Sequence, residues 1–205
     1  MGYTHAFFAV DIDQLKGLFG SNNDKLLAEI LNARADDIEE LDESFEDEIN
    51  DGELPSAETA LRQIFSGTIQ PSMDGDMHAQ VLLVICEHLG EQVFGGEYGV
   101  AGVADHPYDS LLLQSGPPLP IPEPEDVPEI RYLTLEQIDD EIALASAKHD
   151  KVASDSAEAM STLRKAFGLR RGGIDPEEMQ EDIDAYIETL QKVKAIGKGV
   201  VSFYE

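Results

Sequence analysis

Residues 76–94 read DMHAQVLLVICEHLGEQVF and hold the longest apolar run of the chain, Val81–Cys86, with its only cysteine. At about 100° per residue, the polar face of a helix here narrows to Gln80, Glu87 and Glu91. The residues that cover most of the remaining arc are Met77, Val81, Leu82, Val84, Ile85, Cys86, Leu89 and Val93. A helix that is apolar nearly all round must be wrapped by other elements. The stretch is therefore predicted to be the central, buried helix of the fold.

The charge balance restricts the partners of the chain. Of 205 residues, 42 are acidic and 14 are basic, which gives a formal net charge of -28. Binding to a nucleic-acid backbone or to an anionic membrane requires Lys and Arg, so we expect neither nucleic acid nor membrane as a partner. A basic protein partner fits this balance, as does a highly saline cell.

The length is enough for one sizeable core, and we expect residues 1–205 to form a single domain. The start, MGYTHAFFAVDID, lacks the basic region of a secretory signal, which favours a cytoplasmic protein. Cys86 lies in an apolar run and is read as a buried, inert thiol. No pattern in the sequence indicates an oligomeric state.

Strand and helix patterns alternate along the chain. Tyr3–Val10 is aromatic and β-branched enough for a strand, and apolar residues from Leu26 to Ile49 form one seam of a long helix. Short helices are expected after Asp11 and after Ser56, each capped by that residue.

The second half of the chain is predicted to contain a long proline-rich segment. Residues 116–128, GPPLPIPEPEDVP, hold six prolines and are expected to form an extended arm over the surface, with a domain linker as the alternative. Thr134 and Gln137 form a capping box before a helix, and Pro176 opens another. With strands at Ile130–Leu133 and Val200–Tyr204, the predicted class is α+β: a helix-rich single domain with a small sheet, formed from the N- and C-terminal strands, packed on the central helix.

Four segments carry a resemblance to a known family. These are GYTHAFFAVDID at the start, ICEHLG in the middle, YLTLEQI later on, and GKGVVSFYE at the end. In this layout the chain resembles the YfbM-like group of uncharacterised bacterial proteins, mainly at the two chain ends. The resemblance implies a bacterial, soluble, single-domain α+β protein and supplies no catalytic residues.

The first candidate site is acidic. Between Asp36 and Glu53 the chain has eleven acidic residues and no basic one. The carboxylates expected to face a partner are Asp36, Glu39, Glu40, Glu43, Glu46 and Asp47. The alternative is a well-solvated face that reflects a saline habitat.

The second candidate site is a pocket around His88, which falls within the apolar arc of the central helix. It would combine His88 with His5, His106 and the glycine-rich loop Gly95–Gly102. The alternative is a core histidine with a hydrogen-bond partner. No zinc, calcium, phosphate-loop or nucleophile-elbow motif is present, so we expect no catalytic residues, no metal and no cofactor.

The preferred interpretation is a non-enzymatic bacterial interaction protein, an inhibitor or immunity-type factor that binds a basic protein through the acidic helical surface. The alternative is a small-ligand binding protein or enzyme that uses the His88 pocket.

Overall fold

The computed structural model describes residues 5–70, 75–96, 110–124, 128–150, 152 and 176–204. Its elements, in chain order, are β1 (His5–Val10), α1 (Ile12–Lys16), α2 (Asp24–Ala33), α3 (Ala35–Ser44), α4 (Glu46–Asp51), α5 (Ala57–Ser66), α6 (Asp76–Leu89), β2 (Glu91–Gly96), α8 (Leu111–Gln114), β3 (Glu129–Leu133), the 3-10 turn η1 (Leu135–Gln137), a helix over 138–150, α10 (Pro176–Ile196) and β4 (Gly199–Tyr204).

The described strands form one antiparallel, four-stranded sheet in the order β2-β1-β4-β3. The N- and C-terminal strands, β1 and β4, pair at its centre, with His5 opposite Tyr204 and Val10 opposite Gly199. This pairing confirms that the two ends of the chain build the sheet together. The α+β, helix-rich architecture predicted from the sequence is also confirmed.

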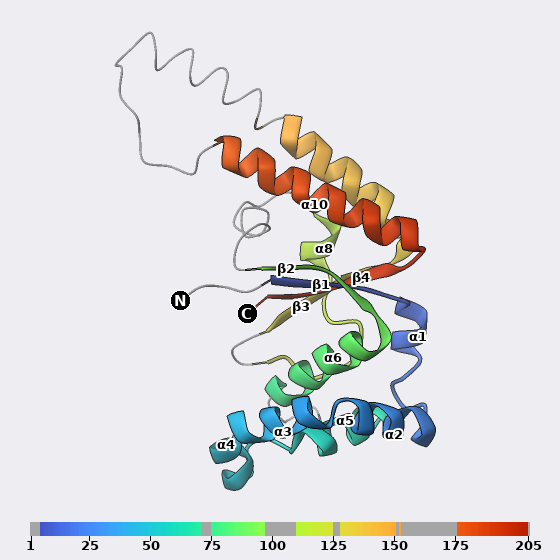
Figure 1. Ribbon diagram of the computed structural model, residues 1–205, viewed down its shortest axis with the longest axis vertical. Coiled ribbons are helices and arrows are strands. Elements are labelled where there is room, and N and C mark those ends of the chain that lie inside the picture. Colours follow the sequence, from blue (N-terminus) through green and yellow to red (C-terminus); the bar gives the residue numbers. More distant parts are fainter. Residues whose placement is uncertain are drawn as a thin grey trace, which may run out of the picture.

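Helices cover both faces of the sheet (Figure 1). Below it lies α6, and α2 to α5 form a further layer beneath α6. Above it lie α10 and the helix over 138–150. Because side chains alternate along a strand, Phe8 and Val10 join the lower core, whereas Phe7 and Ala9 join the upper one. The sheet thus divides the molecule into two hydrophobic cores.

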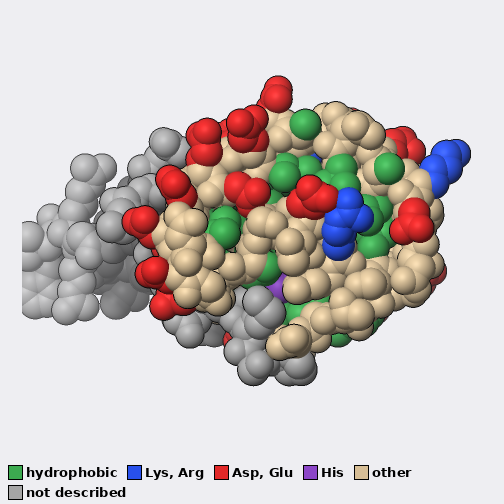
Figure 2. All heavy atoms as spheres, turned by 90° about the horizontal axis from the view of Figure 1, so that it is seen from below, with side chains coloured by type: hydrophobic (Ala, Val, Ile, Leu, Met, Phe, Trp, Pro, Cys, Tyr) green, Lys and Arg blue, Asp and Glu red, His purple; other side chains and the backbone are tan. Residues whose placement is uncertain are grey.

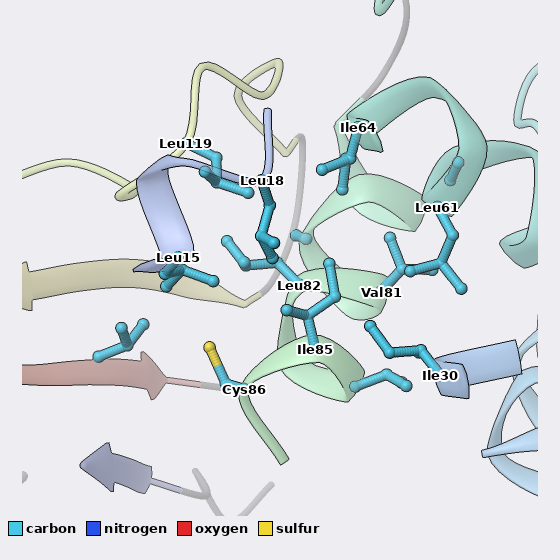
Figure 3. Packing of buried hydrophobic residues seen from close by; sticks show 14 of the residues in the cluster. Leu15, Leu18, Ile30, Leu61, Ile64, Val81, Leu82, Ile85, Cys86 and Leu119 are labelled. Carbon is cyan, nitrogen blue, oxygen red and sulfur yellow. The ribbon is translucent and has the colours of Figure 1, made fainter. Parts of the chain in front are cut away.

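Helix α6 is the centre of the lower core, as expected. Its Val81, Leu82 and Ile85 are fully buried. Figure 3 shows them among side chains of the neighbouring elements, which include Ile30 of α2, Leu61 and Ile64 of α5, Leu15 of α1, and Leu18. No described helix is both long and apolar enough to cross a membrane.

The predicted length of the central helix is wrong. It ends at Leu89, and residues 91–96 form strand β2 instead of a further turn. The chain turns at Gly90, where an added Cβ would lie 2.8 Å from the carbonyl oxygens of both Ala9 and Cys86. This close approach lets the chain leave α6 and pair with β1, so Val93 belongs to a strand.

The single long helix predicted from Leu26 to Ile49 is also divided. Arg34 and Phe45 separate it into α2, α3 and α4, although hydrogen bonds from Arg34 N to Ile30 O and from Phe45 N to Leu41 O continue the helical pattern. The shared seam lets all three segments pack on the lower core. The acidic residues therefore lie on two successive short helices, α3 and α4.

Several predicted helix starts are confirmed by their caps. The side chain of Asp11 accepts a hydrogen bond from Gln14 N, and that of Ser56 accepts one from Thr59 N. Thr134 and Gln137 form the predicted capping box. These caps satisfy backbone donors that a helix leaves free at its first turn.

The described part of the proline-rich arm lies against the lower core. Leu119 is buried in it (Figure 3). Ile121 packs on it. A Cβ on Gly75, before the first turn of α6, would meet Pro122 O at 2.2 Å. The arm is thus seated on the domain through residue 122. The apolar residues Ala157, Met160, Leu163, Ala166 and Phe167 predict a further helix ending at Gly168, and this segment lies outside the described residues.

Candidate functional site

All six carboxylates predicted to face a partner are exposed on α3 and α4; they are Asp36, Glu39, Glu40, Glu43, Glu46 and Asp47, here called the acidic row. Within the described part of the chain, none of them forms an ion pair. The row follows the outward side of the helices because Ile38 and Leu41 turn inward to the lower core. The row is a band of negative charge that no described cation pairs with.

Two further acids of α3 have structural partners and do not belong to this band. The Oδ1 atom of Asp42 accepts a hydrogen bond of 2.6 Å from Ala57 N at the start of α5. Asp37 lies 3.3 Å from Arg34. The structure therefore separates acids that support the fold from those that face solvent.

Helix α4 has no buried residue. Its outward residues include Glu46 and Asp47, and Ile49 is its partly buried contact with the lower core. A helix with so little burial gains little stability from packing. Its residues are therefore weakly constrained by the fold.

Apolar side chains lie on the side of α3 and α4 opposite the acidic row, toward the lower core. Five of them on α2, α3, α4 and the junction between the last two are only partly buried, and we call them the apolar strip: Leu26, Leu31, Leu41, Phe45 and Ile49. Figure 2 shows hydrophobic side chains gathered in the middle of the face that carries α2 to α5, with acidic side chains along much of its rim. This combination is typical of an interface more than of a purely solvated face.

Arg34, between α2 and α3, contacts the C-terminal end of α6. Its Nη2 atom donates to Glu87 O at 2.7 Å, and its Nη1 atom lies 3.3 Å from carboxylate oxygens of both Asp37 and Glu87. Burial raises the pKa of Glu87, an effect that Arg34 opposes and Asp37 reinforces. The cluster fastens the α2–α3 junction to the end of α6.

Of the candidate pocket residues that the structure describes, His5 does not lie beside His88. The His88 ring is 14% exposed, and its Nε2 atom lies 3.7 Å from Oε1 of Glu29 on α2. His5 lies at the far end of β1, opposite Gly96, whereas Ala9 pairs with Glu91 close to the end of α6. Four residues of strand, about 13 Å, separate these two points.

His106 and Gly99–Gly102 lie outside the described residues. The register does bring His5 next to the first glycines of the predicted loop, because His5 pairs with Gly96 and Ala6 with Gly95. The pocket interpretation around His88 stays a prediction.

Sequence reasoning missed two buried polar side chains. His78 of α6 is fully buried, with its Nε2 atom 2.7 Å from Oε1 of Gln63. Its place on the apolar arc, ten residues before His88, was the available signal. A buried imidazole bonded to an amide is a typical structural pair.

Glu141 is a buried acidic side chain, and it is fully enclosed. It accepts hydrogen bonds from Ser110 Oγ at 2.6 Å, Leu111 N at 2.7 Å and Tyr186 OH at 2.9 Å. These partners are 30 to 45 residues away in the chain, so no sequence spacing reveals them. The carboxylate ties α8 and α10 to the helix over 138–150.

Cys86 is fully buried in the lower core. Burial raises the pKa of the Cys86 thiol far above its ordinary value, so it holds its proton at neutral pH. Among the residues that the structure describes, no group of three or more His, Cys, Asp and Glu side chains could hold a metal ion.

A family model matches the chain over its whole length. The family described as Domain of unknown function (DUF7691) matches residues 1–205. Neither a curated protein nor a solved structure matches the chain.

Proposed function

The chain belongs to the family described as Domain of unknown function (DUF7691), and we propose that it is a non-enzymatic protein that binds a basic protein partner through the acidic row. An inhibitor or immunity-type factor of the bacterial cytoplasm would act in this way. The YfbM-like kinship, the bacterial origin and the cytoplasmic location are parts of this same proposal.

The observation that carries the proposal is the lack of internal compensation. The six exposed carboxylates form no ion pair with any described residue, while neighbouring Asp37 and Asp42 both have partners. Like charges four residues apart in a helix destabilise it by about 0.2–0.5 kcal/mol per pair. A cationic partner would remove that repulsion on binding.

A second observation concerns specificity. Complementary charge raises the association rate and orients the partner. A slowly dissociating complex also buries apolar surface at the centre of its interface. Figure 2 shows apolar surface in the middle of the face that carries α2 to α5, with acidic side chains along much of its rim. The face therefore combines the two ingredients of a transient or inhibitory interface.

A charge-reversal experiment tests the proposal. The wild type and a Glu39→Lys, Glu43→Lys, Asp47→Lys variant are immobilised and exposed to a lysate of the source organism. Proteins retained by the wild type are purified and titrated against both forms over a salt series. We expect a basic protein that binds the wild type and loses about tenfold or more of its affinity for the variant.

A matched control separates the surface from net charge. Asp140, Glu181 and Glu188 are exposed acids on the helices above the sheet, and their reversal to Lys changes the net charge equally. This variant should bind the basic protein almost as the wild type does. Equal retention by the first variant would refute the proposal.

A further inference from the structure

The sequence contains two Asp-Gly dipeptides, Asp51–Gly52 and Asp74–Gly75. In such a dipeptide the glycine nitrogen can attack the side-chain carboxyl carbon of the aspartate, because glycine has no Cβ to obstruct the approach and permits unusual backbone angles. The surroundings of each glycine therefore decide whether the reaction occurs in the folded chain. The structure describes both glycines and Asp51, whereas Asp74 lies outside the described residues.

Gly52 lies in open surroundings at the C-terminal end of α4. Its φ of 77° is in the left-handed region, and a Cβ built on it would meet no described atom within 4 Å. Asp51 and Gly52 are both exposed. The nitrogen of Gly52 donates to Ile49 O at 3.1 Å, so it becomes free to react when the last turn of the helix opens.

Opening of α4 requires little free energy. The helix has six residues and none of them is buried, while Ile49 is partly buried against the lower core. A helix this short is not stable by itself, and segments with few buried contacts open far more often than the whole domain unfolds. Each opening frees the nitrogen of Gly52 beside the exposed carboxyl group of Asp51.

Gly75 has the opposite surroundings, at the start of α6. It is buried, and a Cβ built on it would lie 2.2 Å from Pro122 O and 2.8 Å from the carbonyl carbon of Glu123. Its own carbonyl accepts a hydrogen bond of 2.8 Å from Ala79 N, in the first turn of a helix that buries eight side chains. Freedom of movement at Gly75 requires the proline-rich arm to separate from α6, which is a much larger opening.

We infer that Asp51 is a site of spontaneous modification, at which the folded chain converts aspartate to isoaspartate. The nitrogen of Gly52 forms a bond to Cγ of Asp51, and the hydroxyl oxygen of the carboxyl group leaves as water with the amide proton, which gives a cyclic succinimide. Water then adds to the backbone carbonyl carbon of Asp51, and the bond from this carbon to the nitrogen of Gly52 breaks. The main chain now continues through Cγ. Water is released and taken up again, so the conversion needs no cofactor and leaves the mass unchanged.

The product lengthens the main chain by one carbon atom at the end of α4. The hydrogen bonds from Gly52 N to Ile49 O and from Glu53 N to Glu48 O lose their register, so α4 loses its C-terminal turn. Leu54 is buried in the lower core and holds the chain that follows. The change is therefore confined to α4, and the inference does not depend on the proposed function.

Peptide mapping of aged protein tests the inference. The full chain is kept for weeks at neutral pH, either folded or in urea, and is then digested with a protease that cleaves before aspartate and not before isoaspartate. In urea the two dipeptides should react at similar rates, because the surroundings of both glycines are lost. In the folded chain we expect isoaspartate to form at least about tenfold faster at Asp51 than at Asp74. Equal protection of the two positions in the folded chain would overturn the inference.

Two variants test whether opening of α4 controls the reaction. Ile49→Ala removes the partly buried contact of α4 and should raise the rate at Asp51 severalfold, toward the rate in urea, with the rate at Asp74 unchanged. Ile196→Ala, at an isoleucine that is 43% exposed at the end of α10, is the matched control and should change neither rate. If Ile49→Ala leaves the rate at Asp51 unchanged and below the rate in urea, the inference is contradicted.

Discussion

Helix α3 packs against α6 in the lower half of the molecule and is followed by α4, yet α6 and the pair α3–α4 are built in opposite ways. α6 buries eight of its side chains and has one acidic residue in its first turn. α3 buries one side chain and α4 buries none, and both are crowded with acids. Packing in the core restricts which side chains α6 can carry, whereas it places little restriction on the exposed side chains of α3 and α4. A sequence that keeps a repulsive charge pattern where the fold does not require it points to a use outside the fold.

The largest contrast should be seen in stability after truncation. Ile85→Ala opens a cavity in the fully buried part of α6 and should lower the free energy of unfolding by about 2–5 kcal/mol. Ile49→Ala in α4 should lower it by about 1 kcal/mol or less, because Ile49 is only partly buried. Urea unfolding of both variants measures the difference. Equal losses would mean that α4 belongs to the core.

The contrast can be sharpened within α3 itself. Asp42→Ala removes the acceptor for Ala57 N and should destabilise the protein by about 1 kcal/mol. Asp36→Ala removes an exposed carboxylate without an ion pair among the described residues, and should change stability by less than about 0.5 kcal/mol. Thermal unfolding checks both. A larger loss for Asp36→Ala would contradict the division between structural and free acids.

A smaller effect tests the repulsion within the acidic row. Glu43→Gln relieves like-charge pairs with Glu39 and Asp47 and should raise the free energy of unfolding by at most about 1 kcal/mol at low salt. The gain should nearly vanish between about 0.01 M and about 1 M salt, where charges are screened. Stabilisation that is independent of salt would point to a cause other than charge.

The smallest effect concerns the acid at the end of α6. Burial raises the pKa of Glu87 above its ordinary value of 4.5, so the folded state holds this proton more tightly than the unfolded state. The contribution of Glu87 to stability is therefore full below 4.5 and is lost as pH rises through the raised folded value. Glu87→Gln should flatten the dependence of unfolding free energy on pH in that window. An unchanged slope would argue against the burial effect.

The sequence predicted the local features well and the long-range ones poorly. Caps at Asp11 and Ser56 were readable because a cap depends on neighbours three residues away. The end of α6 was not readable, because Leu89 and Val93 fit a helical period, while the turn at Gly90 is imposed by the approach of β1. The breaks at Arg34 and Phe45 have no proline or glycine to announce them.

In the candidate site, too, local features could be predicted from the sequence and long-range contacts could not. Exposure of the acidic row was predictable, since the seam of Ile38 and Leu41 fixes which side of the helix turns inward. The structural role of Asp42 was hidden, because its partner Ala57 is fifteen residues away. The Glu141 cluster was hidden for the same reason.

The most direct measurement follows stability and binding in one variant, Glu39→Lys, Glu43→Lys, Asp47→Lys. If the acidic row serves a partner and the fold does not need it, the free energy of unfolding should stay level or rise, while affinity for the captured basic protein falls about tenfold or more. A loss of about 2 kcal/mol or more in stability, or an unchanged affinity, would contradict this account.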